Sequence, residues 1–214
     1  MLLVGSIMLA LVAAGVAVAV GAGSEDTTPP LGPDLTTTVP VAEHASAQAL
    51  AAFGILRRDF AGSDALPASS GRDLQSTAAV TRFGMNPALA RRAETAAGAV
   101  WVIPGNGNTC LVANVAPVAT GGTDVSQGGA SCASDDDAAA GTLVMSTTLD
   151  AAKPPHELIA GLVPDGVDQA VVQRSDGSRQ TLAVHDNVYT AEFDGTSADT
   201  VTFTIGAREV VVRP

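Results

Sequence analysis

The chain has 214 residues, of which 46% are hydrophobic, enough to bury the core of one domain with a smaller annex. Acidic residues outnumber basic residues 22 to 11, and the formal net charge is −11. Such a surface repels phosphate backbones, so we expect no nucleic acid among the partners. The apolar residues are mostly Ala and Val with few aromatic side chains, which favours strands.

The N-terminus is predicted to be directed to a membrane. Residues 2–22 are apolar or small apart from Ser6, and a helix of this length can cross the roughly 30 Å hydrocarbon core of a bilayer. We favour an uncleaved signal anchor over residues 1–23, with a cleaved signal peptide as the alternative. The expected location is therefore extracytoplasmic, membrane-anchored, or secreted if the N-terminus is cleaved.

A linker and a helical annex are predicted to follow this segment. Residues 24–43 are rich in Pro and Thr, a composition that buries too little apolar surface to fold and predicts a linker. Residues 44–98 are expected to form the annex. Its first helix is predicted over residues 44–60, with Leu50, Phe53, Leu56 and Phe60 on one stripe.

A second annex helix is predicted from Ala88 to about Thr95. Asn86 is a suitable N-cap, and Pro87 suits the first helical position. The annex also contains Arg57, Arg58, Arg82, Arg91 and Arg92. Scattered arginines on helices are usually solvated or paired with carboxylates, and we expect that here.

Residues 99–214 are predicted to form a strand-rich domain. It begins with a hairpin, residues 99–103 and 109–115, around a Pro-Gly-Asn-Gly-Asn turn. Glycine pairs at 121–122 and 128–129 predict a loop, and Ser134 is expected to cap a short helix that starts with three aspartates. Further strands are expected at 142–148, 158–163, 167–174, 179–185, 188–193, 200–205 and 208–212.

These elements predict a mainly β fold with an α annex. It consists of the N-terminal membrane helix, two or three short helices and an antiparallel β-sandwich of about seven to nine short strands with one disulfide. Asp176-Gly177 gives the strongest hairpin signal of the second half, and Asp186-Asn187 a further turn. We favour an immunoglobulin-like sandwich over a barrel.

Cys110 and Cys132 are the only two cysteines. An even pair outside the reducing cytoplasm predicts a disulfide between them. The competing interpretation makes one cysteine a nucleophile with His156 or His185, but the flanking residues match no cysteine-protease motif, and no Cys-x-x-Cys is present.

Other catalytic patterns are incomplete. Gly129-Ala-Ser-Cys-Ala133 approaches the Gly-x-Ser-x-Gly elbow of serine hydrolases but ends in alanine and places a half-cystine beside Ser131. His44, His156 and His185 each neighbour a carboxylate in the sequence. Because adjacent residues of a strand point to opposite faces, these neighbours do not form catalytic pairs by themselves.

Cofactor and metal motifs are likewise missing from the sequence. Residues 135–137 lack the alternating spacing of a calcium loop, and no His-Glu-x-x-His is present. Residues 105–108 precede a strand and not the helix that a phosphate site needs. We therefore expect no catalytic, cofactor-binding or metal-binding residue and no cofactor, and we assign only the disulfide pair Cys110 and Cys132.

Five short stretches resemble a family of uncharacterised secreted or membrane-anchored proteins of high-GC Gram-positive bacteria. They are, in order, residues 53–58, 86–92, 101–107, 161–167 and 186–189. The resemblance covers most of the chain after the linker and implies an envelope location. It carries no activity, ligand or catalytic residue.

The sequence thus favours a non-enzymatic extracytoplasmic module that binds an envelope protein or a wall polymer. The alternative is a hydrolase using Ser131 or a histidine with a distant carboxylate. The two differ in one structural feature, the convergence of these side chains within hydrogen-bonding reach.

Overall fold

The computed structural model describes residues 39–67, 78–95, 98–120, 123–150, 156–195 and 197–214, all within one compact unit. The predicted membrane segment 2–22 and most of the predicted linker lie outside the described residues. Within the described ranges, no helix is both long and apolar enough to span a membrane. The end of the predicted linker packs on the body, because Ala42 is buried and its N–H donates to the carbonyl of Gly84.

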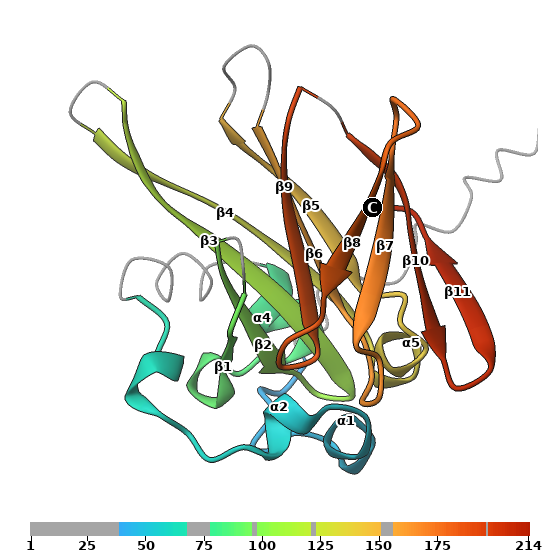
Figure 1. The fold of residues 1–214 in the computed structure, drawn as a ribbon. Coiled ribbons are helices and arrows are strands. Elements are labelled where there is room, and N and C mark those ends of the chain that lie inside the picture. The colour runs from blue at the N-terminus through green and yellow to red at the C-terminus, as the bar shows by residue number, and fades with distance from the viewer. Residues whose placement is uncertain (1–38, 68–77, 96–97, 121–122, 151–155, 196) are drawn as a thin grey trace, which may run out of the picture. The chain divides into compact units, whose positions relative to one another are not determined.

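Within the described residues, eleven strands form three antiparallel sheets (Figure 1). This confirms the mainly β prediction, with more strands than expected. The first sheet has the order β1 (Arg91–Ala93), β2 (Ala99–Pro104), β3 (Asn108–Thr120), β4 (Thr123–Ser134). The second is β5 (Val144–Asp150), β6 (His156–Leu162), β9 (Val188–Asp194), and the third is β11 (Arg208–Val212), β10 (Ala198–Ile205), β7 (Gln169–Arg174), β8 (Arg179–Ala183).

The second sheet lies between two hydrophobic cores, because the side chains of a strand alternate between its faces. Leu158, Ala160 and Leu162 of β6 pack in a core shared with the first sheet and the N-terminal helices. Ile159, from the other face of β6, packs with the third sheet, as does Tyr189 of β9. The register pairs Tyr189 with Gly161, where a side chain would clash with the tyrosine ring.

Strand β2 of the first sheet is buried on both faces. Val100 and Val102 of β2 face the core shared with β6, whereas Trp101 and Ile103 face a third core. Phe83, at the end of helix α4 (Ala78–Phe83), packs against that third core. Burial on both sides explains why β2 is almost uniformly apolar and not alternating.

The predicted helix over residues 44–60 is instead two short helices, α1 (Ala47–Ala52) and α2 (Gly54–Arg57). Ser46 caps α1, and Phe53 between the helices is extended and completely buried. The helix breaks because the first amides of α2 donate to distant side chains: Gly54 N–H to Asp165 and Ile55 N–H to Asn187. Phe60 is exposed and does not join the predicted stripe.

The predicted helix from Ala88 to Thr95 is also wrong. Asn86 does cap a turn with Pro87 at its start, but the turn is a 3-10 helix, η2 (Pro87–Leu89), and the chain then enters β1. β1 forms because it pairs with β2, with Arg92 opposite Trp101. A second 3-10 turn, η1 (Gly62–Asp64), follows α2.

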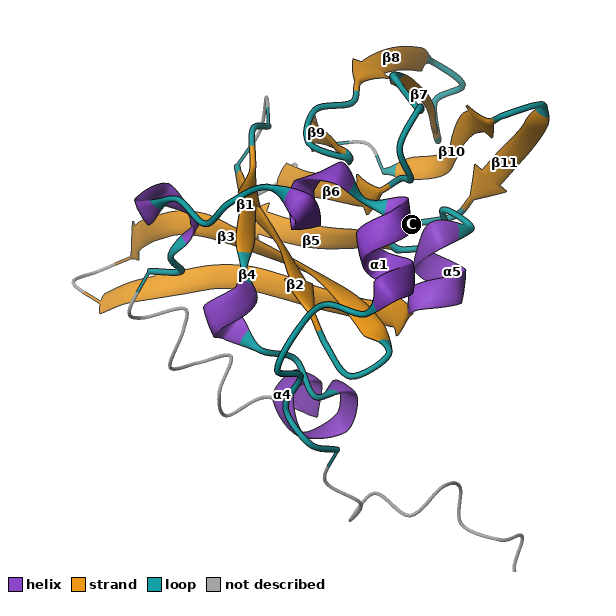
Figure 2. Cartoon of the chain, turned by 90° about the horizontal axis from the view of Figure 1, so that it is seen from below, coloured by secondary structure: helices purple, strands orange, loops and turns teal. Residues whose placement is uncertain are grey.

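The loop predicted around Gly128-Gly129 is strand, because β4 pairs with β3 almost along its whole length. Gly129 admits the close approach of Met145 on β5, since a Cβ there would lie 2.8 Å from the methionine Cε. The short helix after Ser134 is confirmed as α5 (Asp135–Ala139), with Ser134 Oγ accepting from the Asp137 N–H. Figure 2 shows α5 beside α1, where Ser46 Oγ donates to Asp135 at 2.5 Å.

The predicted disulfide is confirmed. Cys110 and Cys132 are bonded and lie directly opposite each other on β3 and β4, with Cα atoms 4.1 Å apart. The bond therefore links two paired strands. Cys110 belongs to the same core as Trp101.

Candidate functional site

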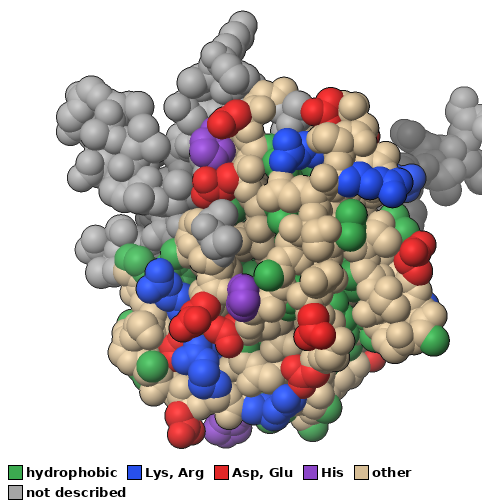
Figure 3. Space-filling view, in the orientation of Figure 1, with side chains coloured by type: hydrophobic (Ala, Val, Ile, Leu, Met, Phe, Trp, Pro, Cys, Tyr) green, Lys and Arg blue, Asp and Glu red, His purple; other side chains and the backbone are tan. Residues whose placement is uncertain are grey.

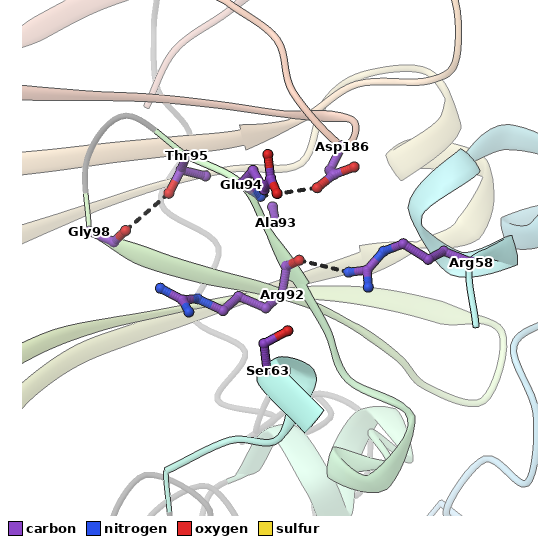
Figure 4. A pocket seen from close by; sticks show the side chains of 8 residues that line it. All are labelled: Arg58, Ser63, Arg92, Ala93, Glu94, Thr95, Gly98 and Asp186. Carbon is purple, nitrogen blue, oxygen red and sulfur yellow. Dashed lines mark hydrogen bonds between the residues drawn. The ribbon is translucent and has the colours of Figure 1, made fainter. Parts of the chain in front are cut away.

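A cavity of about 580 Å³ opens beside the edge strand β1, and we call it the β1 pocket (Figure 4). This volume falls in the range of small-molecule sites. Its lining comes from four separate parts of the chain, namely the residue after α2, η1, the β1 segment and the turn between β8 and β9. The lining residues are Arg58, Ser63, Arg92, Ala93, Glu94, Thr95, Gly98 and Asp186.

One side of the β1 pocket is built on an ion pair whose carboxylate is buried. The Asp64 side chain is fully buried and accepts two hydrogen bonds from Arg58, at 2.8 and 3.0 Å. It also accepts the backbone N–H groups of Ala61 at 2.7 Å and Arg92 at 2.9 Å. Burial raises the pKa of Asp64, but these hydrogen bonds outweigh it and hold that pKa below its ordinary value.

These contacts also provide hydrogen-bond partners for the backbone groups on the unpaired edge of β1. The Arg92 N–H donates to Asp64, the Arg92 carbonyl accepts from Arg58 at 2.9 Å, and the Glu94 N–H donates to Asp186 at 3.1 Å. An edge strand normally presents such groups to another strand. Because side chains already occupy them here, a ligand of the β1 pocket meets side chains and not an open backbone ladder.

The far side of the β1 pocket is a tight turn. Asp186 and Asn187 have φ of 49° and 65° and connect β8 to β9, as expected for the two central residues of a type I′ hairpin turn. Asn187 accepts the Ile55 N–H at 3.0 Å and donates to the Val163 carbonyl at 3.1 Å. The turn therefore holds Asp186 in place against α2 and β6.

Two charged side chains of the β1 pocket, Arg92 and Glu94, form no ion pair with any described residue. The Arg92 guanidinium lies 6.0 Å from the centre of the Trp101 ring and, among the described residues, makes no ion pair. The Glu94 carboxylate is exposed and has no hydrogen bond or ion pair to any described residue. Figure 4 shows the Arg92 side chain extended along the pocket, with Ser63 on one side and Glu94 on the other.

The structure does not bring the candidate hydrolytic residues together. Ser131 is half-buried in β4 opposite Leu111. His156, at the start of β6, lies 3.2 Å from the Glu192 carboxylate and 3.5 Å from that of Asp194. Neither carboxylate is its sequence neighbour. No hydrogen bond in the described part of the chain joins Ser131 to a histidine.

The histidines are also separate from one another. Figure 3 shows the three histidine side chains at three different places on one face of the molecule. The backbone of His185 bonds to Val188 in the β8–β9 turn, and His44 lines a second, smaller cavity of about 310 Å³ beside residues 105–107. Acidic and basic side chains are interspersed on the same face, with no large basic patch in that view. Over the described ranges, no group of three His, Cys, Asp or Glu residues is arranged to hold a metal ion.

The sequence did not reveal the β1 pocket. The sequence predicts Arg58 and Arg92 only as solvated or carboxylate-paired residues and Asp186 only as a turn residue. The hydrogen bonds that bring their segments together join residues 34 and 92 positions apart. The one local signal was Asp186-Asn187 as a turn. No protein-family model matches the chain, and neither a curated protein nor a solved structure matches it.

Proposed function

We propose that the chain is a non-enzymatic binding module of the cell envelope, and that the β1 pocket is its ligand site. The observation that carries this is the chemistry of the pocket lining. It offers an uncommitted guanidinium, an uncommitted carboxylate and hydroxyl groups, but neither a histidine nor a thiol. Such a lining suits recognition by charge and hydrogen bonding.

The proposed location is extracytoplasmic. A disulfide supports an oxidising compartment, since cytosolic thiols are kept reduced. We propose that residues 2–22 attach the chain to the membrane, or export it if they are cleaved, and that the Pro- and Thr-rich linker holds the body away from the surface. The partner would be an envelope protein or a wall polymer, and the net charge of −11 disfavours nucleic acid.

We also propose that strands β5 to β11 are an immunoglobulin-like sandwich. If they are lettered A to G in chain order, the second sheet has the order A-B-E and the third G-F-C-D. The two sheets enclose one core of Ile159, Tyr189, Phe193, Val172 and Phe203. This strand order supports the proposal, because it matches the immunoglobulin-type order except that the fourth strand pairs with the third.

The proposed location is tested with the full chain fused, after Pro214, to a reporter that is active only when its own disulfides have formed. We expect activity outside the cytoplasm and none inside it. An uncleaved anchor stays with membranes through a carbonate wash, whereas a cleaved chain is released. A reporter that is active only in the cytoplasm would contradict the proposed location.

The binding role is tested with the tagged full chain and its pocket variant R92Q/E94Q in parallel captures from envelope extract. The matched control is R213Q/E209Q, which makes the same charge changes at exposed positions of the C-terminal strand and tail. Wild type and control should enrich the same protein or polymer, and the pocket variant should lose it. Equal enrichment by all three would show that the β1 pocket is not the binding site.

A further inference from the structure

We propose that the ligand of the β1 pocket is a zwitterion of the amino-acid type, a free amino acid or a short peptide with both termini charged. Its carboxylate would pair with Arg92, and its ammonium group would lie between Glu94 and Asp186. This inference rests on the proposed function, because it names the ligand class of the same site.

The anionic end of the ligand is assigned from the state of the two pocket arginines. Arg58 is bound to Asp64 and to the Arg92 carbonyl, so its charge is already compensated. Arg92 has the Trp101 ring beneath it and no carboxylate partner among the described residues. A guanidinium in this state can form the two parallel hydrogen bonds that a carboxylate accepts.

The cationic end of the ligand is assigned from the two carboxylates. Glu94 is exposed, with its carboxylate unpaired in the described structure. Asp186 uses one oxygen, Oδ2, to accept the Glu94 N–H, and no described group donates to the other. An ammonium group has three donors and can bond both carboxylates.

The balance of charges excludes the simpler ligand classes. An inorganic anion would meet two carboxylates beside the single uncommitted guanidinium, and a divalent cation would meet Arg92 without a cluster of three suitable ligands in the described chain. An apolar ligand, or a sugar stacked on an aromatic ring, would find Trp101 only 3% exposed. A ligand with one charge of each sign fits both halves of the pocket.

The dimensions agree with a small zwitterion. Arg92 and Glu94 are two positions apart in extended chain, so their Cα atoms are separated by about 7 Å. Their side chains can therefore reach opposite ends of an amino acid or dipeptide. The cavity of about 580 Å³ leaves room for further residues of a peptide.

The test is a titration of the full chain with glycylglycine and its three blocked forms, followed by calorimetry or chemical-shift changes. The blocked forms are N-acetylglycylglycine, glycylglycinamide and N-acetylglycylglycinamide. We expect glycylglycine to bind, and each blocked end to weaken binding about tenfold, as loss of a charged hydrogen bond predicts. Free glycine, titrated in parallel, separates an amino-acid site from a peptide site.

Two variants test which side chain binds which charged end of the ligand. R92Q should bind glycylglycine and glycylglycinamide equally, because it no longer distinguishes a free carboxylate. E94Q should reduce the preference for glycylglycine over N-acetylglycylglycine. Neither side chain is buried, so both variants should keep their Tm within about 4 °C of wild type. R213Q and E209Q should keep both preferences.

Several results would overturn the inference. These are no binding of glycylglycine or glycine at about 10 mM, equal binding of all four dipeptide forms, or the same loss in R213Q as in R92Q. If glycylglycine fails but envelope capture still depends on Arg92 and Glu94, the ligand class is wrong and the binding module stands. If capture does not depend on them either, the proposed function fails as well.

Discussion

Asp64 shows how one buried carboxylate can organise three segments of a chain. It is fully buried and holds Arg58 after α2, the Ala61 amide before η1 and the Arg92 amide of β1. Its own backbone carbonyl accepts the Trp101 indole N–H at 3.1 Å. A buried charge is tolerated only when such partners compensate it.

The substitution D64N should therefore destabilise the fold by about 2 kcal/mol, because the Arg58 guanidinium, which is itself partly exposed, loses its hydrogen-bonded counter-charge. Urea unfolding followed by circular dichroism measures this loss as a lower midpoint at an unchanged slope. The exposed Asp199 provides the control, and D199N should change stability by less than about 0.5 kcal/mol. Equal effects of the two substitutions would contradict the role given to Asp64.

The same residue predicts a pH dependence. The pKa of Asp64 is lower in the folded chain than its ordinary value, so the folded state favours the ionised carboxylate. Its contribution is fully present above about pH 5 and is lost as the pH falls through about 3.9 towards the lowered value. Urea midpoints measured at a series of pH values from about 5 downwards should show the stabilities of wild type and D64N converging at low pH. A constant difference would contradict the assignment.

At the scale of elements, the sequence predicted those helices and turns that depend on interactions between neighbouring residues. Ser134 caps α5 because its side chain is next to the amide it serves, and the Asp186-Asn187 turn needs only its own positive φ angles. The seven later strands follow from alternating β-branched runs between turns. The sequence signal failed where distant partners intervene, as at Phe53, where Asp165 and Asn187 take the amides that would have continued the helix.

The β1 pocket could not be predicted from the sequence for the same reason, because contacts between distant parts of the chain bring its residues together. Asn86 and Pro87 are a helix-start signal a few residues before Arg92, yet pairing with Trp101 and a hydrogen bond to the buried Asp64 place Arg92 in a strand. Whether Arg58 or Arg92 is the free cation depends on which one reaches Asp64. That is a property of the packed structure and has no local sequence signature.

Asn187 allows a test at this scale, because it connects the turn, α2 and the end of β6. N187G keeps the left-handed backbone but loses the hydrogen bonds to Ile55 and Val163, and should cost about 2 kcal/mol. N187A adds the strain of a positive φ and should cost roughly 1 kcal/mol more. Urea midpoints give both values. N187G as stable as wild type would mean that the side chain does not hold α2.

At the scale of the whole molecule, the described sheets share cores that cross the predicted boundary between annex and strand domain. Phe53 and Leu56 from the helices pack with Val102 of the first sheet and Leu158 of the second. The second sheet in turn shares its other face with the third sheet through Ile159. Sheets that share cores in this way should lose structure together.

The chain contains one spectroscopic probe next to the first sheet and one between the second and third sheets. Its single tryptophan, Trp101, is buried in the core outside the first sheet, and its single tyrosine, Tyr189, is buried between the second and third sheets. We expect Trp101 fluorescence and the Tyr189 ring signals in NMR to follow the same urea transition, since coincident probes indicate two-state unfolding. Replacing both cysteines with alanine should lower stability by about 3 kcal/mol in the chain-entropy model and move both transitions equally. A Trp101 transition that precedes that of Tyr189 would show instead that the first sheet unfolds as an independent unit, and that the shared core around Leu158 does not couple the sheets.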